Sequence, residues 1–224
     1  METRNNQTVA FTGHRKERIL QGFGNDPRIL AQIREAVAGM VIELYGQGYK
    51  EYYTGMASGF DMTAAEAVLQ VRERYEGIKL IAAVPFRKQP LWFEAEDRLL
   101  YARLLERMDR VVMVSENYHK GCYLRRDEYM VRKADTVIAY WDLVPKGGTF
   151  YTVSKALESG KPVINLYERM EKRSVKADRP SHFASCILYY LFLRTGREAT
   201  LFPPFLLLRF LLLLLDLHFS HNLL

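Results

Sequence analysis

Two glycine-bearing turns are the parts of this chain whose residue types and spacing best suit a ligand. Residues 55–61 read GMASGFD and residues 146–149 read KGGT, and each turn lies between a short apolar run and a helical pattern. Glycine lets the backbone approach a ligand closely, and a following helix directs unpaired N–H groups and its positive dipole end at the same place. The two turns together predict a site for a phosphate-bearing, nucleotide-like ligand.

Side chains beside these turns indicate how such a ligand could be held, and each has a structural alternative. Arg15 follows Gly13 at the end of an apolar run, so its forked guanidinium could clamp a phosphate; the alternative is a solvated arginine in the basic run 14–18. Asp61 is either the N-cap of a helix or an acceptor for a ribose hydroxyl. The Thr149 hydroxyl either joins backbone N–H groups around a phosphate or caps a helix in a plain loop.

Arg126 is the sharpest single candidate. Met130 lies four residues further on, so a helix places both residues on one face, with Arg126 pointing into the ligand crevice and Met130 in the core. With that orientation, removing Arg126 is expected to cost little stability; the alternative is a solvated charged face that begins at Arg125. Asn117 lies in a loop that either contacts a base or ribose or is an ordinary surface loop.

The complete set of predicted ligand-binding residues comes from five segments: Gly13, Arg15, Gly55, Ser58, Gly59, Asp61, Asn117, Arg126, Gly147, Gly148 and Thr149. The five histidines share no ligand spacing with cysteines or carboxylates, so no metal site is predicted. No catalytic residue and no cofactor is identified.

Strands and helices must alternate to position these residues. Short apolar runs predict six strands, at residues 8–12, 51–54, 79–84, 110–114, 136–140 and 163–166. Helical patterns predict helices from Asp26, with Pro27 at the first helical position, to about residue 46, and then at 62–75, 89–108, 123–133 and 149–159. This order predicts an α/β, Rossmann-like three-layer sandwich with a mostly parallel sheet of about six strands, whose carboxyl ends bind the ligand.

The composition fits one globular domain followed by a tail. With 224 residues and 49% hydrophobic content, the chain can build one sizeable core, which we assign to residues 1–168. The tail, residues 169–224, is apolar and basic, and its two apolar runs are too short or interrupted for a membrane span. It is a membrane-surface or partner-binding helix, a helix packed on the domain, or a terminus with no evolved fold.

Aromatic residues are assigned to the core by default. One of them, Trp141, directly follows the fifth predicted strand and could instead stack on a base. The assignment covers Trp92, Phe93, Tyr123, Tyr140, Trp141 and Tyr151.

Charge and cysteine content bear on partners and location. The formal net charge is +6, but residues 1–168 carry 24 Lys+Arg against 22 Asp+Glu, so most of the basic excess lies in the tail. This weakens the case for nucleic-acid binding by the domain. Two cysteines are too few for a disulfide framework, and the polar first residues show no signal segment, so a cytoplasmic protein is expected.

Four segments in order resemble the YpsA-like branch of the SLOG superfamily. They are Thr12-Gly13-His14-Arg15, the turn at 55–61 with Ala64 and Ala65 after it, residues 125–135, and Gly147-Gly148-Thr149. That superfamily groups Rossmann-like proteins related to the DNA-processing protein DprA and to the LOG cytokinin-activating phosphoribohydrolases. The resemblance covers roughly residues 8–166 and implies a nucleotide or nucleotide-derived ligand at the strand ends. It also implies that Arg126 is similar to the active-site arginine of LOG proteins.

One departure from LOG leaves the enzymatic question open. In LOG a catalytic glutamate pair follows the glycine-threonine turn, whereas Phe150, Tyr151 and Thr152 follow it here, so Asp127 or Glu128 would have to substitute. The leading function is therefore a sensor or scaffold that binds a nucleotide-derived small molecule. The alternatives are a phosphoribohydrolase-type nucleotide-processing enzyme and a DprA-like nucleic-acid binder. A homodimer is plausible, and the tail could contact a membrane.

Overall fold

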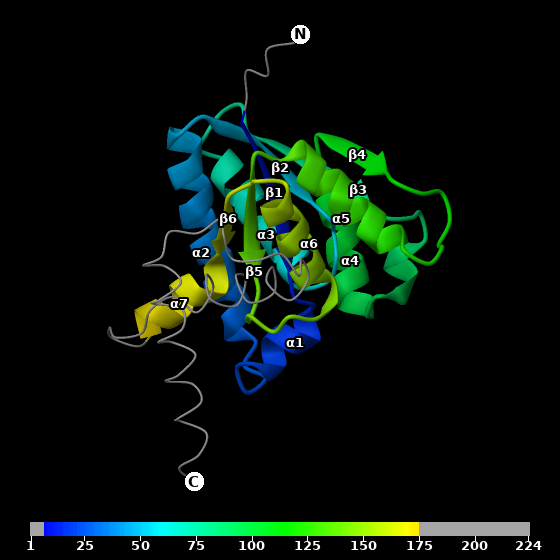
Figure 1. Cartoon of the computed structure of the whole chain (residues 1–224), viewed down its shortest axis with the longest axis horizontal. Helices are drawn as coiled ribbons and strands as arrows, with labels where there is room; N and C mark the ends of the chain where they lie inside the picture. Colours follow the sequence, from blue (N-terminus) through cyan, green and yellow to red (C-terminus); the bar gives the residue numbers. More distant parts are fainter. Residues whose placement is uncertain (1–6, 175–224) are drawn as a thin grey trace, which may run out of the picture. The chain divides into compact units, whose positions relative to one another are not determined.

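The computed structural model describes residues 7–174 and contains one sheet of six parallel strands in the order β4-β3-β2-β1-β5-β6 (Figure 1). The predicted α/β fold is confirmed, and every strand pair in the sheet is parallel. The strands are β1 (Gln7–Gly13), β2 (Tyr49–Thr54), β3 (Lys79–Val84), β4 (Arg110–Met113), β5 (Thr136–Tyr140) and β6 (Val163–Asn165).

Helices cover both faces of the sheet and make the three layers. Helices α2, α3 and α7 pack on one face, while α5 and α6 pack on the other (Figure 1). Within the described residues the helices are α1 (Lys16–Gln21), α2 (Arg28–Gly46), α3 (Phe60–Arg72), the 3₁₀ helix η1 (Gln89–Trp92), α4 (Ala95–Leu105), α5 (Cys122–Lys133), α6 (Gly147–Glu158) and α7 (Leu166–Ser174).

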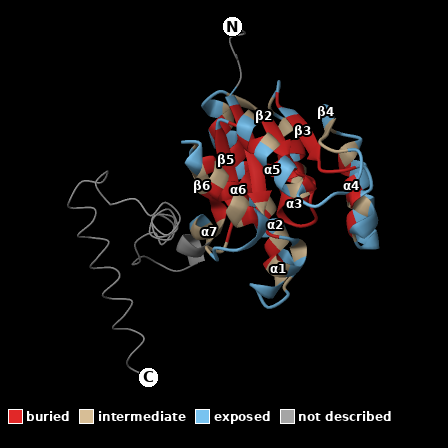
Figure 2. Cartoon of the chain, turned by 45° about the vertical axis from the view of Figure 1, so that its right-hand side comes forward, coloured by how far each residue is buried: buried red, intermediate tan, exposed pale blue. Residues whose placement is uncertain are grey.

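Alternation along the central strands divides the core into two clusters. On β1, Val9 and Phe11 pack with α2 and α3, whereas Ala10 between them faces the layer formed by α5 and α6. A strand covered on both faces becomes a nearly continuous apolar run, which is why the sequence showed these strands clearly. Figure 2 shows the buried residues gathered in the sheet and on the inner sides of the helices, with exposed residues on their outer sides.

The long helix predicted for residues 89–108 is wrong. The chain instead forms η1, turns extended at Phe93, and starts α4 only at Ala95. Pro90 lies in the first turn, where a helix tolerates proline, so the break comes later: the buried carboxylate of Asp97 binds the Ser58 hydroxyl and Lys16 and fixes the start of α4. The break leaves Trp92 exposed, so its assignment to the core is also wrong.

Two helices were absent from the sequence prediction. Helix α1 follows β1 at once, and α7 runs through residue 168, the end predicted for the domain. That boundary stays a prediction, and the tail beyond residue 174 lies outside the described residues. Across residues 7–174, no helix combines the length and apolar character that crossing a membrane requires.

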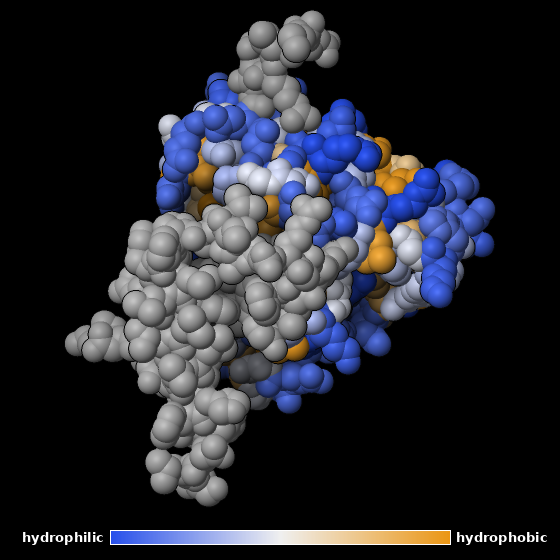
Figure 3. Space-filling view, in the orientation of Figure 1, coloured by the Kyte–Doolittle hydropathy of each residue, from blue (hydrophilic) through white to orange (hydrophobic). Residues whose placement is uncertain are grey.

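The strand order reverses between β1 and β5. The chain builds β1 to β4 in one direction and then returns to add β5 and β6 on the other side of β1. Connections leaving β1 and β5 therefore diverge and open a crevice at their carboxyl ends, the usual ligand position in such sheets. On the described part of the face seen in Figure 3, hydrophilic residues predominate and hydrophobic ones form small separate patches.

Candidate functional site

A cavity of about 440 Å³ lies at the carboxyl ends of β1 and β5, where the strand order reverses. Its size falls within the roughly 300–1,000 Å³ typical of small-molecule sites. Four segments supply its walls: the start of α1 and the residues before it, the turn after β2, the first half of α5, and the turn into α6. The lining residues are Thr12, Gly13, His14, Arg15, Arg18, Ala57, Asp61, Tyr123, Leu124, Arg126, Asp127, Lys146, Gly147, Gly148 and Thr149.

The turn into α6 presents unpaired donors to this cavity. Gly147 has φ +90°, a conformation that favours glycine, and the helix begins there without a side-chain cap. No acceptor among the described residues binds the N–H groups of Gly147, Gly148 or Thr149, and all three residues line the cavity. A Cβ added to Gly148 would meet nothing closer than a carboxylate oxygen of Asp127 at 3.9 Å. The backbone here is open to a ligand.

The turn after β2 is filled by the protein itself. The carbonyl oxygen of Gly55 accepts a hydrogen bond from Arg126, and a Cβ at Gly55 would overlap that guanidinium. Gly59 has φ +101° and lies against the backbone before α1, while the Ser58 hydroxyl donates to Asp97. Of the predicted ligand-binding residues, Gly55, Ser58 and Gly59 therefore do not line the cavity.

Arg126 lies between two buried carboxylates at the cavity wall. Its Nε donates to Asp127 Oδ1 at 2.7 Å, and Nη1 lies 3.5 Å from Asp61 Oδ2. The residue is only 5% exposed, whereas its neighbour Arg125 is exposed, which resolves the ambiguity between the two arginines. Burial alone would lower the pKa of Arg126, but Asp127 and Asp61 outweigh it and raise the pKa. The guanidinium is therefore charged and committed to protein partners.

Asp61 is the second residue of α3, and Gly59 occupies the N-cap position, so the N-cap interpretation of Asp61 is wrong. Its Oδ2 accepts a hydrogen bond of 3.4 Å from the Ala57 backbone. Burial raises the pKa of Asp61 to about 6, with Arg126 opposing the rise. Burial likewise raises the pKa of Asp127, again opposed by Arg126. The cavity thus contains two carboxyl groups that gain protons more readily than exposed ones.

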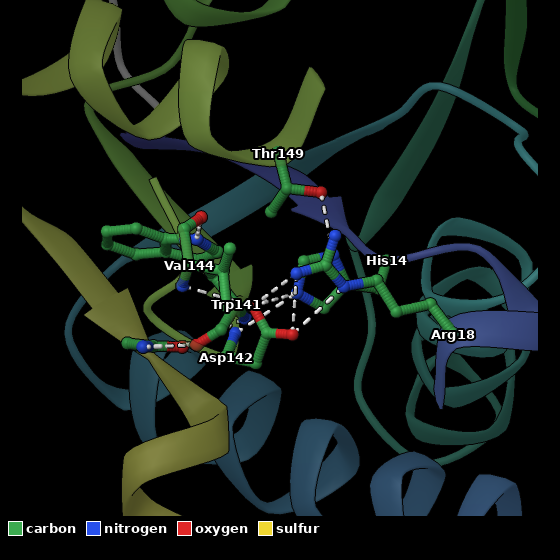
Figure 4. A network of polar contacts seen from close by, with 7 residues as sticks. His14, Arg18, Trp141, Asp142, Val144 and Thr149 are labelled. Atoms are coloured by element: carbon green, nitrogen blue, oxygen red, sulfur yellow. Dashed lines mark hydrogen bonds and ion pairs between the residues drawn. The ribbon is translucent and has the colours of Figure 1, made fainter. Parts of the chain in front are cut away.

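His14 is a site residue that the sequence analysis missed. It is 6% exposed, its Nε2 lies 2.9 Å from Asp142 Oδ1, and its Nδ1 lies 3.4 Å from the Thr149 hydroxyl (Figure 4). Burial and the nearby Arg18 lower its pKa more than Asp142 raises it, so the ring is neutral at pH 7 and orients the hydroxyl of Thr149. The available signal was that His14 and Asp142 each follow a strand, and that those strands, β1 and β5, are neighbours.

The carboxylate of Asp142 also holds Arg18 through a bidentate pair, with Nε–Oδ2 and Nη2–Oδ1 distances of 2.9 and 3.0 Å. Figure 4 shows both His14 and Arg18 on this one carboxylate. The contact ties α1 to the segment after β5. It holds the rim of the cavity in place and does not involve Arg15 or Lys146.

Two cations at the cavity form no ion pair with another described residue. Arg15 is exposed and lies over the Tyr123 ring, 5.6 Å from its centroid. Lys146 directly precedes Gly147, the first residue of α6. Among the described residues no carboxylate forms an ion pair with either of them. Together with the α6 turn they make this end of the cavity attractive to an anion.

The structure brings together seven of the predicted ligand-binding residues and separates four. Gly13, Arg15, Asp61, Arg126, Gly147, Gly148 and Thr149 line the cavity, whereas Gly55, Ser58, Gly59 and Asn117 do not. Asn117 is exposed in the loop after β4. Trp141 is fully buried against Phe150, with ring centroids 5.5 Å apart, so it is not accessible to a base. Glu128, proposed as a substitute acid, is exposed and bound to Tyr151, while Asp127 lines the cavity.

Comparison with known proteins gives a family match over nearly all of the sheet. The model of the YspA SLOG family, also written YpsA, matches residues 9–166. A UPF0398 protein of Halalkalibacterium halodurans is 25% identical over 152 residues, which are 67% of this chain and 80% of the relative.

Solved structures of lower identity are also similar. DNA processing protein A from Streptococcus pneumoniae has a TM-score of 0.48 and 16% identity, covering 84% of this chain and 57% of that one. DNA processing protein A from Helicobacter pylori has a TM-score of 0.48 and 17% identity, covering 84% of this chain and 81% of that one. Its structure is described for its single-stranded DNA binding mode.

Proposed function

We propose that this chain, which belongs to the YspA SLOG family, binds a nucleotide or nucleotide-derived ligand as a sensor or scaffold. One observation carries the proposal. The same cavity, where β1 and β5 end, is lined by three α6 residues whose backbone N–H groups find no acceptor within residues 7–174. It is also lined by Arg15 and Lys146, which form no ion pair within that range. Helix N-termini with unpaired N–H groups, forked guanidinium groups and ammonium groups all favour phosphate.

The rest of the cavity suits the sugar and base of a nucleotide. Tyr123 gives the wall an aromatic face, and Asp127 Oδ2 lies 3.9 Å from the position of a Cβ on Gly148, beside the free turn. A carboxylate next to a phosphate site can accept hydrogen bonds from ribose hydroxyls, as in dinucleotide-binding folds. The volume of about 440 Å³ leaves room for more than a phosphate.

The residue after the α6 turn and the pairing of the cavity carboxylates favour binding without turnover. Phe150, at the position after Thr149, packs against the buried Trp141 ring, so that position contributes to the core and supplies no acid. Arg126 holds Asp61 and Asp127, the two carboxyl groups that reach the cavity. These contacts hold both carboxyl groups in place, so neither is free to turn toward an attacking water.

A phosphoribohydrolase-type enzyme is the second candidate, and the pKa of Asp61 supports it. A carboxyl group with a pKa of about 6 can donate a proton near neutral pH, as general acids do. Incubation with AMP and chromatography of the products separates the two candidates. Release of adenine and ribose 5-phosphate that disappears in Asp61→Asn would replace the sensor proposal.

Thermal denaturation with added ligands tests the proposal. ADP, ADP-ribose and ribose 5-phosphate are the probes, because a ligand that binds only the folded state stabilises it by about 2.7 kcal/mol at a hundred times its Kd. Gly148→Asp introduces a carboxylate at the free turn and should abolish the shift. Gly39→Asp is the matched control, since Gly39 lies exposed on α2 with open space around it. No shift with any probe, or equal shifts in both variants, would overturn the proposal.

A DprA-like nucleic-acid binder remains the third candidate, and salt distinguishes it. Titration with a single-stranded oligonucleotide at rising salt should show a steep fall in affinity if several phosphates are contacted. We expect the described domain, with its nearly balanced charge, to bind ADP more tightly than the oligonucleotide at physiological salt.

A further inference from the structure

Four aromatic rings form a cluster, here called the aromatic ledge, at the carboxyl ends of β3 and β4. Phe86 lies buried at its centre, and Trp92, Tyr118 and Tyr123 surround it with centroid distances of 5.1, 5.4 and 5.8 Å. Trp92 is 59% exposed and Tyr118 is 55% exposed, and their rings meet each other at 4.9 Å. Large aromatic rings held in place yet left open to solvent are typical of surfaces that stack on flat ligands.

The aromatic ledge is continuous with the cavity. Tyr123 belongs to both, since it lines the cavity on one side and contacts Phe86 on the other. Arg15, one of the two unpaired cations, lies over that same Tyr123 ring. A ligand with its phosphate at α6 and its other end over Tyr123 therefore points toward Trp92 and Tyr118.

Contacts among the surrounding segments hold the aromatic ledge in place. Arg87, next to Phe86, binds Glu116 by a backbone hydrogen bond of 3.4 Å and an ion pair of 2.8 Å, so the segments after β3 and β4 are joined. The amide of Gln89, at the start of η1, donates to the carbonyl oxygen of Met56 at 3.4 Å, beside the cavity residue Ala57. The exposed rings thus belong to segments anchored near the cavity.

From this geometry we infer that the aromatic ledge is a nucleobase subsite for the ligand bound at α6. The inference rests on the proposed function and narrows it, because it requires a ligand with a base and disfavours a sugar phosphate alone. Stacking on Trp92 and Tyr118 accepts any base, since every base has a flat face. The occupant is therefore the base of the small ligand in the cavity, and a second protein copy on the rings is the competing outcome.

Isothermal titration of ADP and of ribose 5-phosphate tests the inference, because only ADP has a base. Trp92→Ala should weaken ADP binding by about 5- to 150-fold, the usual range for loss of one stacked base, and leave ribose 5-phosphate binding unchanged. Trp92→Phe keeps a ring and should restore most of the affinity. Leu91→Ala is the matched control, since Leu91 is equally exposed on η1 but has no ring to stack on a base.

Fluorescence gives a second measurement on the same variants. The chain has two tryptophans, and Trp141 is fully buried, so ADP should quench the emission of Trp92 and this quenching should vanish in Trp92→Phe. If Trp92→Ala leaves ADP affinity unchanged while Gly148→Asp abolishes it, the nucleobase subsite is wrong and the proposed function stands. If neither probe binds the unaltered chain, the proposed function fails first. A change from dimer to monomer in Trp92→Ala would make the rings an interface and overturn the inference.

Discussion

The turn after β2 and the turn into α6 both lead from a strand into a helix, but the protein occupies only the first. At Gly55 the guanidinium of Arg126 takes the space and the hydrogen bond that a ligand would need. At Gly147 and Gly148 the N–H groups have no acceptor among the described residues, and the space is open. Glycine thus serves two purposes here: close packing of the protein against itself, and access for a ligand.

This comparison separates substitutions that damage folding from those that damage binding. Changes in the turn after β2 should affect stability first. Changes in the turn into α6, and in the cations beside it, should affect binding with little effect on stability. Substitutions on both sides, each with its own comparison, test this division.

The largest expected effect is on the stability of Arg126→Ala. Removing the guanidinium leaves Asp61 and Asp127 buried without their cation, which typically costs about 3–5 kcal/mol of unfolding free energy. The buried contacts of Arg126 therefore predict a larger loss of stability than the sequence did. Urea denaturation measures the cost, and exposed Arg125→Ala, with less than about 0.5 kcal/mol, is the control. A loss below about 1 kcal/mol for Arg126→Ala would show that the two carboxyl groups are not dependent on it.

The next effect is a difference in stability between alanine substitutions in the two turns. Gly55→Ala forces a Cβ into the Arg126 guanidinium and should lower stability by about 1–3 kcal/mol, as overpacking does. Gly148→Ala meets only ordinary contact distances and lies at a helical position, so it should be neutral or stabilise by up to about 1 kcal/mol. Denaturant midpoints of the two variants measure the difference. Equal losses would mean that both turns are closed by the protein.

Arg15→Ala should weaken ADP binding with little change in stability. The exposed guanidinium has no acidic partner among the described residues, so its loss removes a charge-assisted contact to phosphate worth about 1.5–3 kcal/mol, or tenfold to hundredfold in Kd. Calorimetry with ADP measures the change. Arg28→Ala, an exposed arginine paired with Asp26 at the start of α2, should leave Kd unchanged. The same Kd in both variants would place the phosphate elsewhere.

The last effect is a pH dependence of stability that Asp61→Asn should remove. Because the pKa of Asp61 is raised from 3.8 to about 6, the folded state takes up a proton more readily, so stability rises as the pH falls from above 6 toward 4. His14, with a lowered pKa, acts in the opposite direction in both proteins and cancels in the difference. Unfolding free energies at pH 4 to 7 for both proteins measure this. Parallel curves would mean that the Asp61 carboxyl titrates normally.

Much of the fold could be predicted because parallel strands covered on both faces leave apolar runs. All six strands lie within about two residues of their expected positions. The helix at 89–108 could not be predicted correctly, because the amphipathic pattern continues through the break at Phe93 and Glu94. The contacts that bury Asp97 at the start of α4 come from distant elements. Helix α1 has six residues, fewer than two helical turns, so its sequence cannot repeat the helical pattern.

Many residues of the site were predicted, but not which of them bind each other and which remain open to a ligand. Glycines and Arg126 were visible in the sequence, whereas the contact between Arg126 and Gly55 joins residues 71 positions apart. The same holds for His14 and Asp142, which are 128 positions apart. No local pattern contains such pairings. They depend on which strands become neighbours in the sheet.

The contact between Thr8 and Asp135 affects the order in which the chain folds. Thr8, at the start of β1, is bound by its backbone N–H and its hydroxyl to Asp135, 127 positions later, just before β5. Contacts between residues so far apart in the sequence form slowly. During synthesis the edge of β1 that pairs with β5 stays open until β5 has emerged. Because the cavity needs walls from both sides of this late pairing, a ligand held by all of them can stabilise the finished chain but cannot guide its early folding.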